Sequence, residues 1–244
     1  MRTIRIHADL PLSPGMELSL PAQAAEHVAR VLRLVSGDPI TLFNGDGHDY
    51  QAIILDVGKR EVRARIESAS AVQNESPLRL TLAQAVVRGE KMDLIVQKAT
   101  ELGVTRIVPL LTERSEIKLD VGRAEKRLAH WRAVVASACE QGGRARVPEV
   151  VPALSLTAWL DDLPSDQTLR LALLPQATQS SRDLHFLDHA GILVVGPEGG
   201  LGERDITALT AAGFSGLRLG PRILRTETAG MAALAALQAL HGDS

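Results

Sequence analysis

The chain has 244 residues, of which 45% are hydrophobic and 23% are charged, enough apolar material for one large domain or two small ones. Its formal net charge of −2 argues against a strongly basic protein that binds nucleic acid without specificity. The single cysteine, Cys139, excludes a disulfide within the chain and fits a reducing compartment. The N-terminus lacks a signal-peptide pattern and no apolar run reaches membrane-spanning length, so we expect a cytoplasmic protein without a membrane partner.

Residues 1–72 have the pattern of a small β-rich unit. An alanine-rich helix is predicted over 22–34, with four apolar side chains on or near one face: Val28, Val31, Leu32 and Val35. Strands are predicted at 39–44, 48–56 and 60–68. Short strands at this spacing are typical of a small β-barrel.

A polar segment of small residues, 69–77, has the composition of a linker. After it, apolar strand-like runs alternate with helical patterns, which indicates a mostly parallel sheet covered by helices. The strands are predicted at 78–87, 104–111, 169–175, 191–197 and 216–221, and the helices near 90–102, 121–141, 203–212 and 227–241. We therefore predict two domains, 1–72 and 73–244.

Charge is unevenly distributed along the chain. Residues 76–146 carry thirteen Lys and Arg against eight Asp and Glu, whereas the segments before and after have an acidic excess. This local excess of positive charge is either a solvated helix face or a surface that faces phosphate groups.

Two apolar runs end in Gly-Pro and are followed by an acid and a helical pattern. They are ILVVGPEGGLGERD (192–205), which contains Glu198, and LRLGPRILRTETAG (217–230), which contains Glu227. A third turn, Leu174-Pro175-Gln176, ends the preceding run. Ligands of open α/β sheets bind at the carboxyl ends of the strands, so the three turns predict the walls of one pocket. Glycine-rich backbone suits a ligand read by main-chain groups, such as an adenine ring.

Familiar motifs for other chemistries are absent from the sequence. It has neither a dinucleotide-binding G-x-G-x-x-G after a strand nor a P-loop, and it has no nucleophile elbow. The seven histidines are scattered and the one cysteine has no partner, so we predict no metal site.

Several blocks together resemble one known family. The two Gly-Pro segments resemble the last two motifs of the SPOUT methyltransferases. HVARVLRL (27–34), KMDLIVQKATELGV (91–104), PLLTERSE (109–116) and EQGGRARVPEV (140–150) extend the likeness over most of the chain. The whole sequence is similar to the ribosomal RNA small subunit methyltransferase E family, whose members use S-adenosylmethionine (SAM) to methylate N3 of a uridine in small-subunit (16S) rRNA.

The resemblance implies the fold and the partners. The expected fold class is α/β, with a PUA-like β-barrel that helps to bind RNA at 1–72 and a SPOUT domain containing a deep trefoil knot at 73–244. The implied cofactor is SAM, and the implied partners are rRNA within the 30S subunit and a second copy of the chain in a homodimer. The residues leave open whether free rRNA or the assembled subunit is the substrate.

The resemblance also implies a set of site residues. Arg225 is expected to hold an rRNA phosphate or to stabilise the uridine anion, and Glu198 is a turn cap, a ligand contact or a base. Thr226 is expected to cap the last helix, and Glu227 either stabilises that helix end or contacts the methyl donor. The expected cofactor-binding residues are Leu174, Pro175, Gly196, Pro197, Glu198, Gly199, Gly200, Leu219, Gly220, Pro221, Ile223, Leu224, Arg225 and Glu227. The expected RNA-binding residues are Arg33, Lys91, Lys98, Arg114, Gln141 and Arg144.

Two alternatives remain at this point. A SPOUT enzyme of the same fold could act on another RNA, although the shorter SPOUT enzymes lack the N-terminal barrel. A non-catalytic RNA-binding protein with a lapsed pocket is the other alternative, and the intact glycines of both turns argue against it.

Overall fold

The computed structural model describes residues 4–58, 61–116 and 121–243. Its contacts divide the chain into two compact units. The first contains the residues up to Glu75 together with Ala136–Val147, and the second contains Ser76–Val135 and the residues from Pro148 onward. The sequence did not indicate that a segment from the middle of the chain would join the N-terminal unit.

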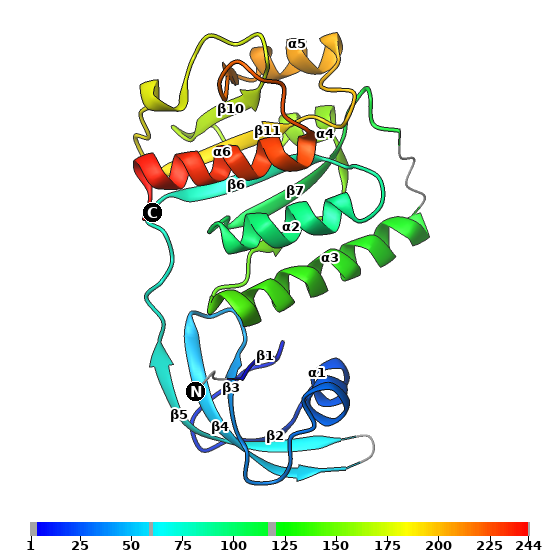
Figure 1. Ribbon diagram of the computed structural model, residues 1–244, viewed down its shortest axis with the longest axis vertical. Coiled ribbons are helices and arrows are strands. Elements are labelled where there is room, and N and C mark those ends of the chain that lie inside the picture. The colour runs from blue at the N-terminus through cyan, green and yellow to red at the C-terminus, as the bar shows by residue number, and fades with distance from the viewer. Residues whose placement is uncertain (1–3, 59–60, 117–120, 244) are drawn as a thin grey trace. The chain divides into compact units, whose positions relative to one another are not determined.

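The first unit is built on a five-stranded, mostly antiparallel sheet (Figure 1). Its order is β1-β3-β4-β5-β2, and only the β1–β3 pair is parallel. The strands are β1 (Arg5–His7), β2 (Glu17–Ser19), β3 (Pro39–Phe43), β4 (His48–Val57) and β5 (Val62–Ala71). On β5, Val62, Ala64 and Ile66 are buried and the residues between them are exposed, so one face of the strand packs against the core. The strand expected at 60–68 begins in the structure at Val62, and Arg60 lies outside the described residues.

The helix expected over 22–34 is shorter than predicted. α1 (Ala22–Glu26) ends after five residues, and a π-helical segment, η1 (His27–Leu32), continues the chain. Arg33 then stops the segment in the left-handed conformation, with φ of 53°. The wider π turn changes the direction of the side chains, so Val28 is buried while Val31 is 66% exposed. Val35, which is 61% exposed, lies beyond Arg33, where the helical segment has already ended. The expectation that all four apolar residues share a face was therefore wrong.

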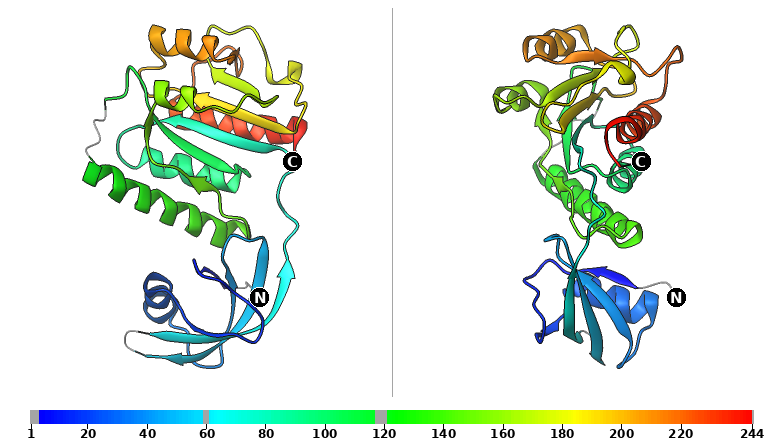
Figure 2. Two further views of the ribbon diagram at one scale, coloured as in Figure 1. Left: turned by 180° about the vertical axis from the view of Figure 1, so that it is seen from behind. Right: turned by 90° about the vertical axis from the view of Figure 1, so that its left-hand side faces the viewer.

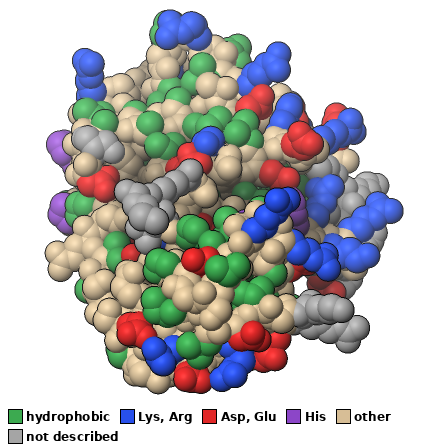
Figure 3. All heavy atoms as spheres, turned by 60° about the horizontal axis from the view of Figure 1, so that its bottom comes forward, with side chains coloured by type: hydrophobic (Ala, Val, Ile, Leu, Met, Phe, Trp, Pro, Cys, Tyr) green, Lys and Arg blue, Asp and Glu red, His purple; other side chains and the backbone are tan. Residues whose placement is uncertain are grey.

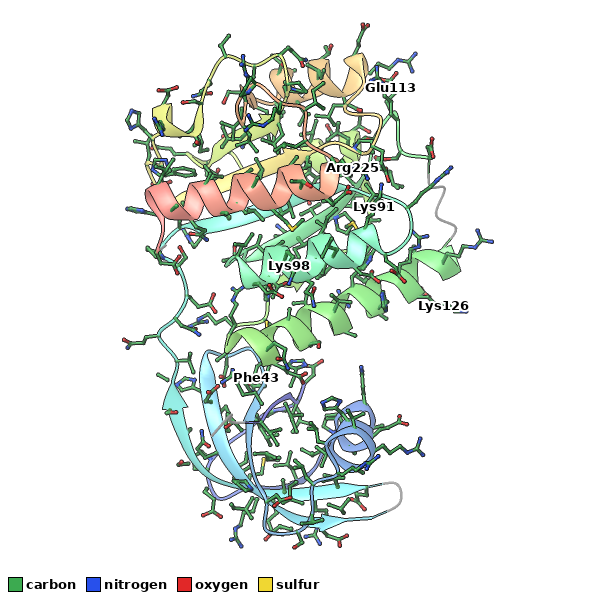
Figure 4. The ribbon with its side chains drawn as sticks, in the orientation of Figure 1. Phe43, Lys91, Lys98, Glu113, Lys126 and Arg225 are labelled. Carbon is green, nitrogen blue, oxygen red and sulfur yellow. The ribbon has the colours of Figure 1, made fainter. Side chains whose placement is uncertain are left out.

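The end of α3 (Val121–Gly142) and the loop after it belong to the first unit through polar contacts. The backbone N–H of His7 donates to Glu140 at 2.9 Å, and Arg5 donates to the backbone oxygen of Arg144 at 3.0 Å. The guanidinium of Arg5 also pairs with Asp49 and lies 4.9 Å from the ring centre of Phe43, which Figure 4 labels.

The second unit is a three-layer α/β structure around a parallel sheet with the order β12-β10-β11-β6-β7-β8, in which β9 also pairs with β7. The right-hand view of Figure 2 shows α2 and α6 on one side of this sheet and α4 on the other. The strands are β6 (Arg79–Ala85), β7 (Arg106–Leu111), β8 (Glu149–Val150), β9 (Leu154–Ser155), β10 (Leu169–Leu173), β11 (Ala190–Val195) and β12 (Ser215–Leu217). The helices are α2 (Lys91–Glu101), α4 (Leu156–Asp161), η2 (Ser181–Asp183), α5 (Glu203–Ala211) and α6 (Thr226–His241).

The sheet order explains where a site can form. β10, β11 and β12 are neighbours and run parallel, so the segments that follow them leave the same edge of the sheet. β12 ends at Leu217, short of the strand expected at 216–221, and in the loop beyond it Gly220 has a φ of +92° before Pro221. Residues 218–225 are thereby released as a loop at the sheet edge.

Candidate cofactor pocket

The three turns predicted from the sequence line one cavity in the second unit. Its volume is about 740 Å³, which is in the range of sites for small ligands. Leu173–Gln176 line it from the end of β10, Val195–Leu201 from the end of β11, and Leu217–Leu219 with Arg222–Glu227 from the loop after β12. Of the residues expected to bind the cofactor, all line this cavity except Pro221, whose neighbours Gly220 and Arg222 do.

The turn after β11 depends on its glycines. A Cβ added at Gly196 would lie 2.9 Å from the backbone nitrogen of Leu201, so the turn is too tight there for a side chain. Gly200 has a φ of +71°, and its N–H donates to the oxygen of Pro197 at 2.9 Å. The backbone is therefore folded back on itself at the pocket wall.

The other two turns are held against each other. The N–H of Leu174 donates to the oxygen of Leu217 at 3.1 Å, and a Cβ added at Gly216 would lie 2.9 Å from the Cβ of Ala177. The Nε of Arg218 donates to the oxygen of Gly220 at 3.0 Å, which closes the loop after β12. These contacts, one between main-chain groups and two involving side chains, fix the shape of this side of the cavity.

Thr226 does not cap α6, which corrects the expectation. The capping position is Arg225, and no side chain within the described part of the chain caps this helix end. Thr226 is instead the first residue of the helix, and its buried hydroxyl donates to the oxygen of Gly196 at 2.6 Å. The hydroxyl thus joins the loop after β12 to the turn after β11.

Glu198 is held at the pocket wall by a basic residue. Its carboxylate lies 3.1 Å from Nζ of Lys91, and Arg114 donates to the neighbouring oxygen of Gly199 at 2.8 Å. Partial burial tends to raise the pKa of Glu198, but hydrogen bonds from the backbone and from Lys91, with the charge of Lys91, hold it below its ordinary value. A carboxylate with a lowered pKa is a weak proton acceptor, so this geometry favours the turn-cap role over the base.

Arg225 is exposed at the pocket rim, at the start of α6 (Figure 4). Among the described residues, no hydrogen bond or ion pair of its guanidinium is found. Its positive charge is therefore available for a phosphate or for a developing anion.

Glu227 has an oxygen without a partner. It lines the cavity from the first turn of α6, and its Oε2 is buried without a hydrogen-bond donor among the described residues. A buried acceptor of this kind at a pocket wall indicates a ligand that brings a donor or a positive charge.

The expected RNA-binding residues of the second unit do not form one cluster. Lys91 and Arg114 contact the Glu198–Gly199 turn, whereas Lys98 pairs with Glu101 at 2.8 Å farther along α2. Figure 4 labels Lys91 and Lys98 on α2 and Lys126 on α3, and Figure 3 shows Lys and Arg side chains gathered toward one side of the face that it draws. Lys91 and Arg114 therefore belong to the lining of the pocket.

The expected RNA-binding residues of the first unit differ in their exposure to solvent. Arg33 is exposed beyond η1, and Gln141 is exposed in the last turn of α3. Arg144 is buried, and its guanidinium pairs with Glu75 through Nε at 3.0 Å. Removing Arg144 from this pair to contact RNA would leave Glu75 without its cation, so the structure argues for a structural role of Arg144.

Sequence reasoning missed several residues of the site. Arg218 and Arg222 line the cavity beside Arg225, and Gln84 is buried in β6 with a hydrogen bond to Thr226. The one available signal for Gln84 was its position as a polar residue within the apolar run of β6.

Other candidates for a site are the single cysteine and groups of metal-ligating side chains. Burial raises the pKa of the Cys139 thiol to about 12, so this thiol is unreactive at neutral pH. Across residues 4–58, 61–116 and 121–243, no group of three or more metal-ligating side chains is found. In the same ranges, no helix is both long and apolar enough to span a membrane.

Comparison with known proteins agrees with this architecture. An RNA methyltransferase domain matches residues 74–238, and an RNA methyltransferase PUA domain matches residues 20–67. The fold and the pocket are thus those of an RNA methyltransferase with a PUA domain. The ribosomal RNA small subunit methyltransferase E of Buchnera aphidicola (strain Sg) is 32% identical over 99% of this chain and 98% of its own, and that of Bacillus subtilis is 31% identical over 92% of both. The chain belongs to the ribosomal RNA small subunit methyltransferase E family.

Solved structures extend the likeness. A methyltransferase of Legionella pneumophila, solved with bound SAM, has a TM-score of 0.96 and 41% identity, with full coverage of both chains. A ribosomal RNA small subunit methyltransferase E of Neisseria gonorrhoeae, also bound to SAM, has a TM-score of 0.92 and 40% identity over 99% of both chains. These likenesses bear out the expected SPOUT-type α/β class with a PUA-like domain, while the trefoil knot stays a prediction.

Proposed function

We propose that this protein transfers a methyl group from SAM to N3 of a specific uridine in small-subunit (16S) rRNA. The observation that carries the proposal is the cavity enclosed by the three turns at one edge of the sheet. Its support from relatives is the bound SAM in the Legionella and Neisseria structures, which match this chain over nearly its whole length.

The residues of the cavity fit this cofactor. Leu174, Leu219 and Leu224 provide apolar walls suited to an adenine ring, and the tight turns at Gly196 and Gly220 offer main-chain groups that can read its edge. The partnerless oxygen of Glu227 suits the positive charges of SAM. These features are what an adenine-containing cation requires of a pocket.

The protein's own contribution is positioning and charge. Bound SAM supplies a methyl group that is already activated, so the chain has to orient the uridine and to deal with its N3 proton. Arg225 remains protonated and is suited to stabilise the uridine anion at the rim. Glu198 retains its place in the site as the anchor of the turn through Lys91, and its base role is the weaker alternative.

The proposal also includes the two domains, their RNA contacts and the partners of the protein. A PUA-like domain at 1–72 contacts RNA through Arg33, and a domain at 73–244 carries the pocket and contacts RNA through Lys91, Lys98, Arg114 and Gln141. The enzyme acts in the cytoplasm as a homodimer, on rRNA within the 30S subunit, and its second domain contains the trefoil knot. Aromatic residues make up only 2% of the chain, so phosphate contacts and RNA shape dominate this recognition over base stacking.

Titration calorimetry of the protein with SAM and with its demethylated product, S-adenosylhomocysteine, tests the cofactor assignment. We expect saturable binding of both, together with a raised unfolding temperature. No heat and no thermal shift with either compound would overturn the assignment and would favour the non-catalytic alternative.

A further inference from the structure

A series of buried hydrogen bonds links the pocket wall to the strand behind it. Nε2 of Gln84 donates to the oxygen of Ala85 at 3.0 Å and to Oγ1 of Thr226 at 3.1 Å. Oγ1 of Thr226 donates in turn to the oxygen of Gly196 at 2.6 Å. Gln84 is 0% exposed and Thr226 is 7% exposed, so these hydrogen bonds are shielded from water.

The chemistry of the partners fixes the direction of these hydrogen bonds. The carbonyl oxygens of Ala85 and Gly196 can only accept a hydrogen bond. The amide nitrogen of Gln84 must therefore face the oxygen of Ala85, and the Thr226 hydroxyl must donate its one proton to the oxygen of Gly196. Thr226 then needs a donor for its own oxygen, and Gln84 supplies it.

These hydrogen bonds connect three elements that form the pocket. Gln84 lies on the central strand β6, Gly196 starts the turn after β11, and Thr226 stands between the two rim residues Arg225 and Glu227. Gln84 itself does not line the cavity. Its amide is nevertheless connected to both turns, because it donates to the hydroxyl that joins them.

Stability alone does not explain a glutamine at this position. Oε1 of Gln84 is buried and has no hydrogen-bond partner among the described residues. Burying an unpaired oxygen is unfavourable, and an apolar side chain of the same size would avoid that cost. What the amide contributes at this position is therefore the two hydrogen bonds of its nitrogen.

We propose that Gln84 is a positioning residue for the cofactor pocket, acting through Thr226 on the oxygen of Gly196 and on the start of α6. This inference rests on the proposed binding of SAM. Gln84 holds the two turns in the spacing that the ligand requires before the ligand arrives, which lowers the cost of ordering them on binding.

Four proteins test the proposal: the wild type and the variants Gln84→Met, Thr226→Val and Thr226→Ser. Met preserves the volume of Gln84 without the donor, Val preserves the shape of Thr226 without the hydroxyl, and Ser keeps the hydroxyl. Calorimetry with SAM and thermal unfolding without ligand are measured for each. Methyl transfer is then measured as a function of SAM concentration.

We expect Gln84→Met and Thr226→Val to bind SAM about tenfold more weakly. That loss corresponds to roughly one hydrogen bond that no longer holds the pocket in its binding conformation. Their KM for SAM should rise, while kcat at saturating SAM and the unfolding temperature of Gln84→Met stay near those of the wild type. Thr226→Ser should bind nearly as the wild type does.

Two results would overturn the proposal. One is unchanged SAM affinity in both Gln84→Met and Thr226→Val. The other is a loss of folding in Gln84→Met, since the amide would then be a structural requirement. A wild type that binds no SAM is a different outcome, because it refutes the cofactor assignment on which this inference depends.

Discussion

The Nζ atom of Lys91 lies 3.1 Å from the Glu198 carboxylate, and this contact joins the start of α2 to the turn after β11. Both side chains are about two-fifths exposed, at 39% and 41%. An ion pair at that exposure contributes little to global stability. Its effect is local, because it connects the turn after β11 to the start of α2 and lowers the pKa of Glu198.

The first prediction concerns the role of Glu198. The pKa of Glu198 is lowered in the folded chain, so its ion pair is fully present above the ordinary carboxyl range and is lost only as the pH falls through the depressed value. We expect Glu198→Gln to lower kcat/KM by at most about fivefold, as for an exposed ion pair. Its pH–rate profile should match that of the wild type. A lost limb of that profile in Glu198→Gln would identify Glu198 as the base after all.

The second prediction concerns Arg225. Removing a charge that stabilises a developing anion typically lowers kcat by about 100-fold or more, so Arg225→Ala should lose activity on this scale. Its unfolding temperature should stay unchanged, because the side chain is exposed at the rim. Arg204→Ala, which removes an exposed arginine on α5, is the matched control and should retain full activity. Equal turnover in the Arg225 and Arg204 variants would remove Arg225 from the mechanism.

The third prediction concerns the partnerless oxygen of Glu227. Glu227→Gln keeps the shape of the side chain and removes its negative charge. SAM carries a positive sulfonium that S-adenosylhomocysteine lacks, so the variant should lose about tenfold in affinity for SAM, the size of one charge-assisted contact, and less for the product. Calorimetry with both compounds measures the ratio. An unchanged ratio of the two affinities would place the Glu227 carboxylate away from the sulfonium and leave it as a stabiliser of the helix end.

The fourth prediction concerns the tight turn at Gly196. A methyl group at this position meets the nitrogen of Leu201 at 2.9 Å, so Gly196→Ala should destabilise the fold by about 1–3 kcal/mol and weaken cofactor binding. Gly142→Ala is the control, because a Cβ there has nothing within 4 Å, and its effect should stay within about 0.5 kcal/mol. Chemical unfolding of both variants gives the comparison. Equal stability of the two would show that the turn relaxes to admit a side chain.

The strands and helices that could be predicted are those whose apolar residues recur at a regular spacing along the chain. β5 alternates cleanly, and the apolar runs that become β6, β7, β10 and β11 are long enough to stand out. The short α4 and the two-residue β8 and β9 carry too few residues to show a pattern. The shift from α1 to the π-helical η1 is not encoded in a hydrophobic period, and it moved Val31 to the surface.

The pocket was predictable because Gly and Pro residues mark its turns directly after apolar strands. The partners of its side chains were not. Thr226 looks like a helix cap from its position, but its hydroxyl is used to join two turns, and its donor Gln84 lies 142 residues away in the sequence. Contacts of this kind depend on which strands become neighbours, which a single sequence does not state.

The most direct test of the proposed reaction is mass mapping of small-subunit rRNA from cells with and without the gene for this protein. We predict that one uridine loses a single methyl group at N3 in the deletion strain. The methyl group should return when the wild-type chain is supplied, and it should not return with Arg225→Ala. An rRNA whose methylated uridines are identical in both strains would contradict the proposal.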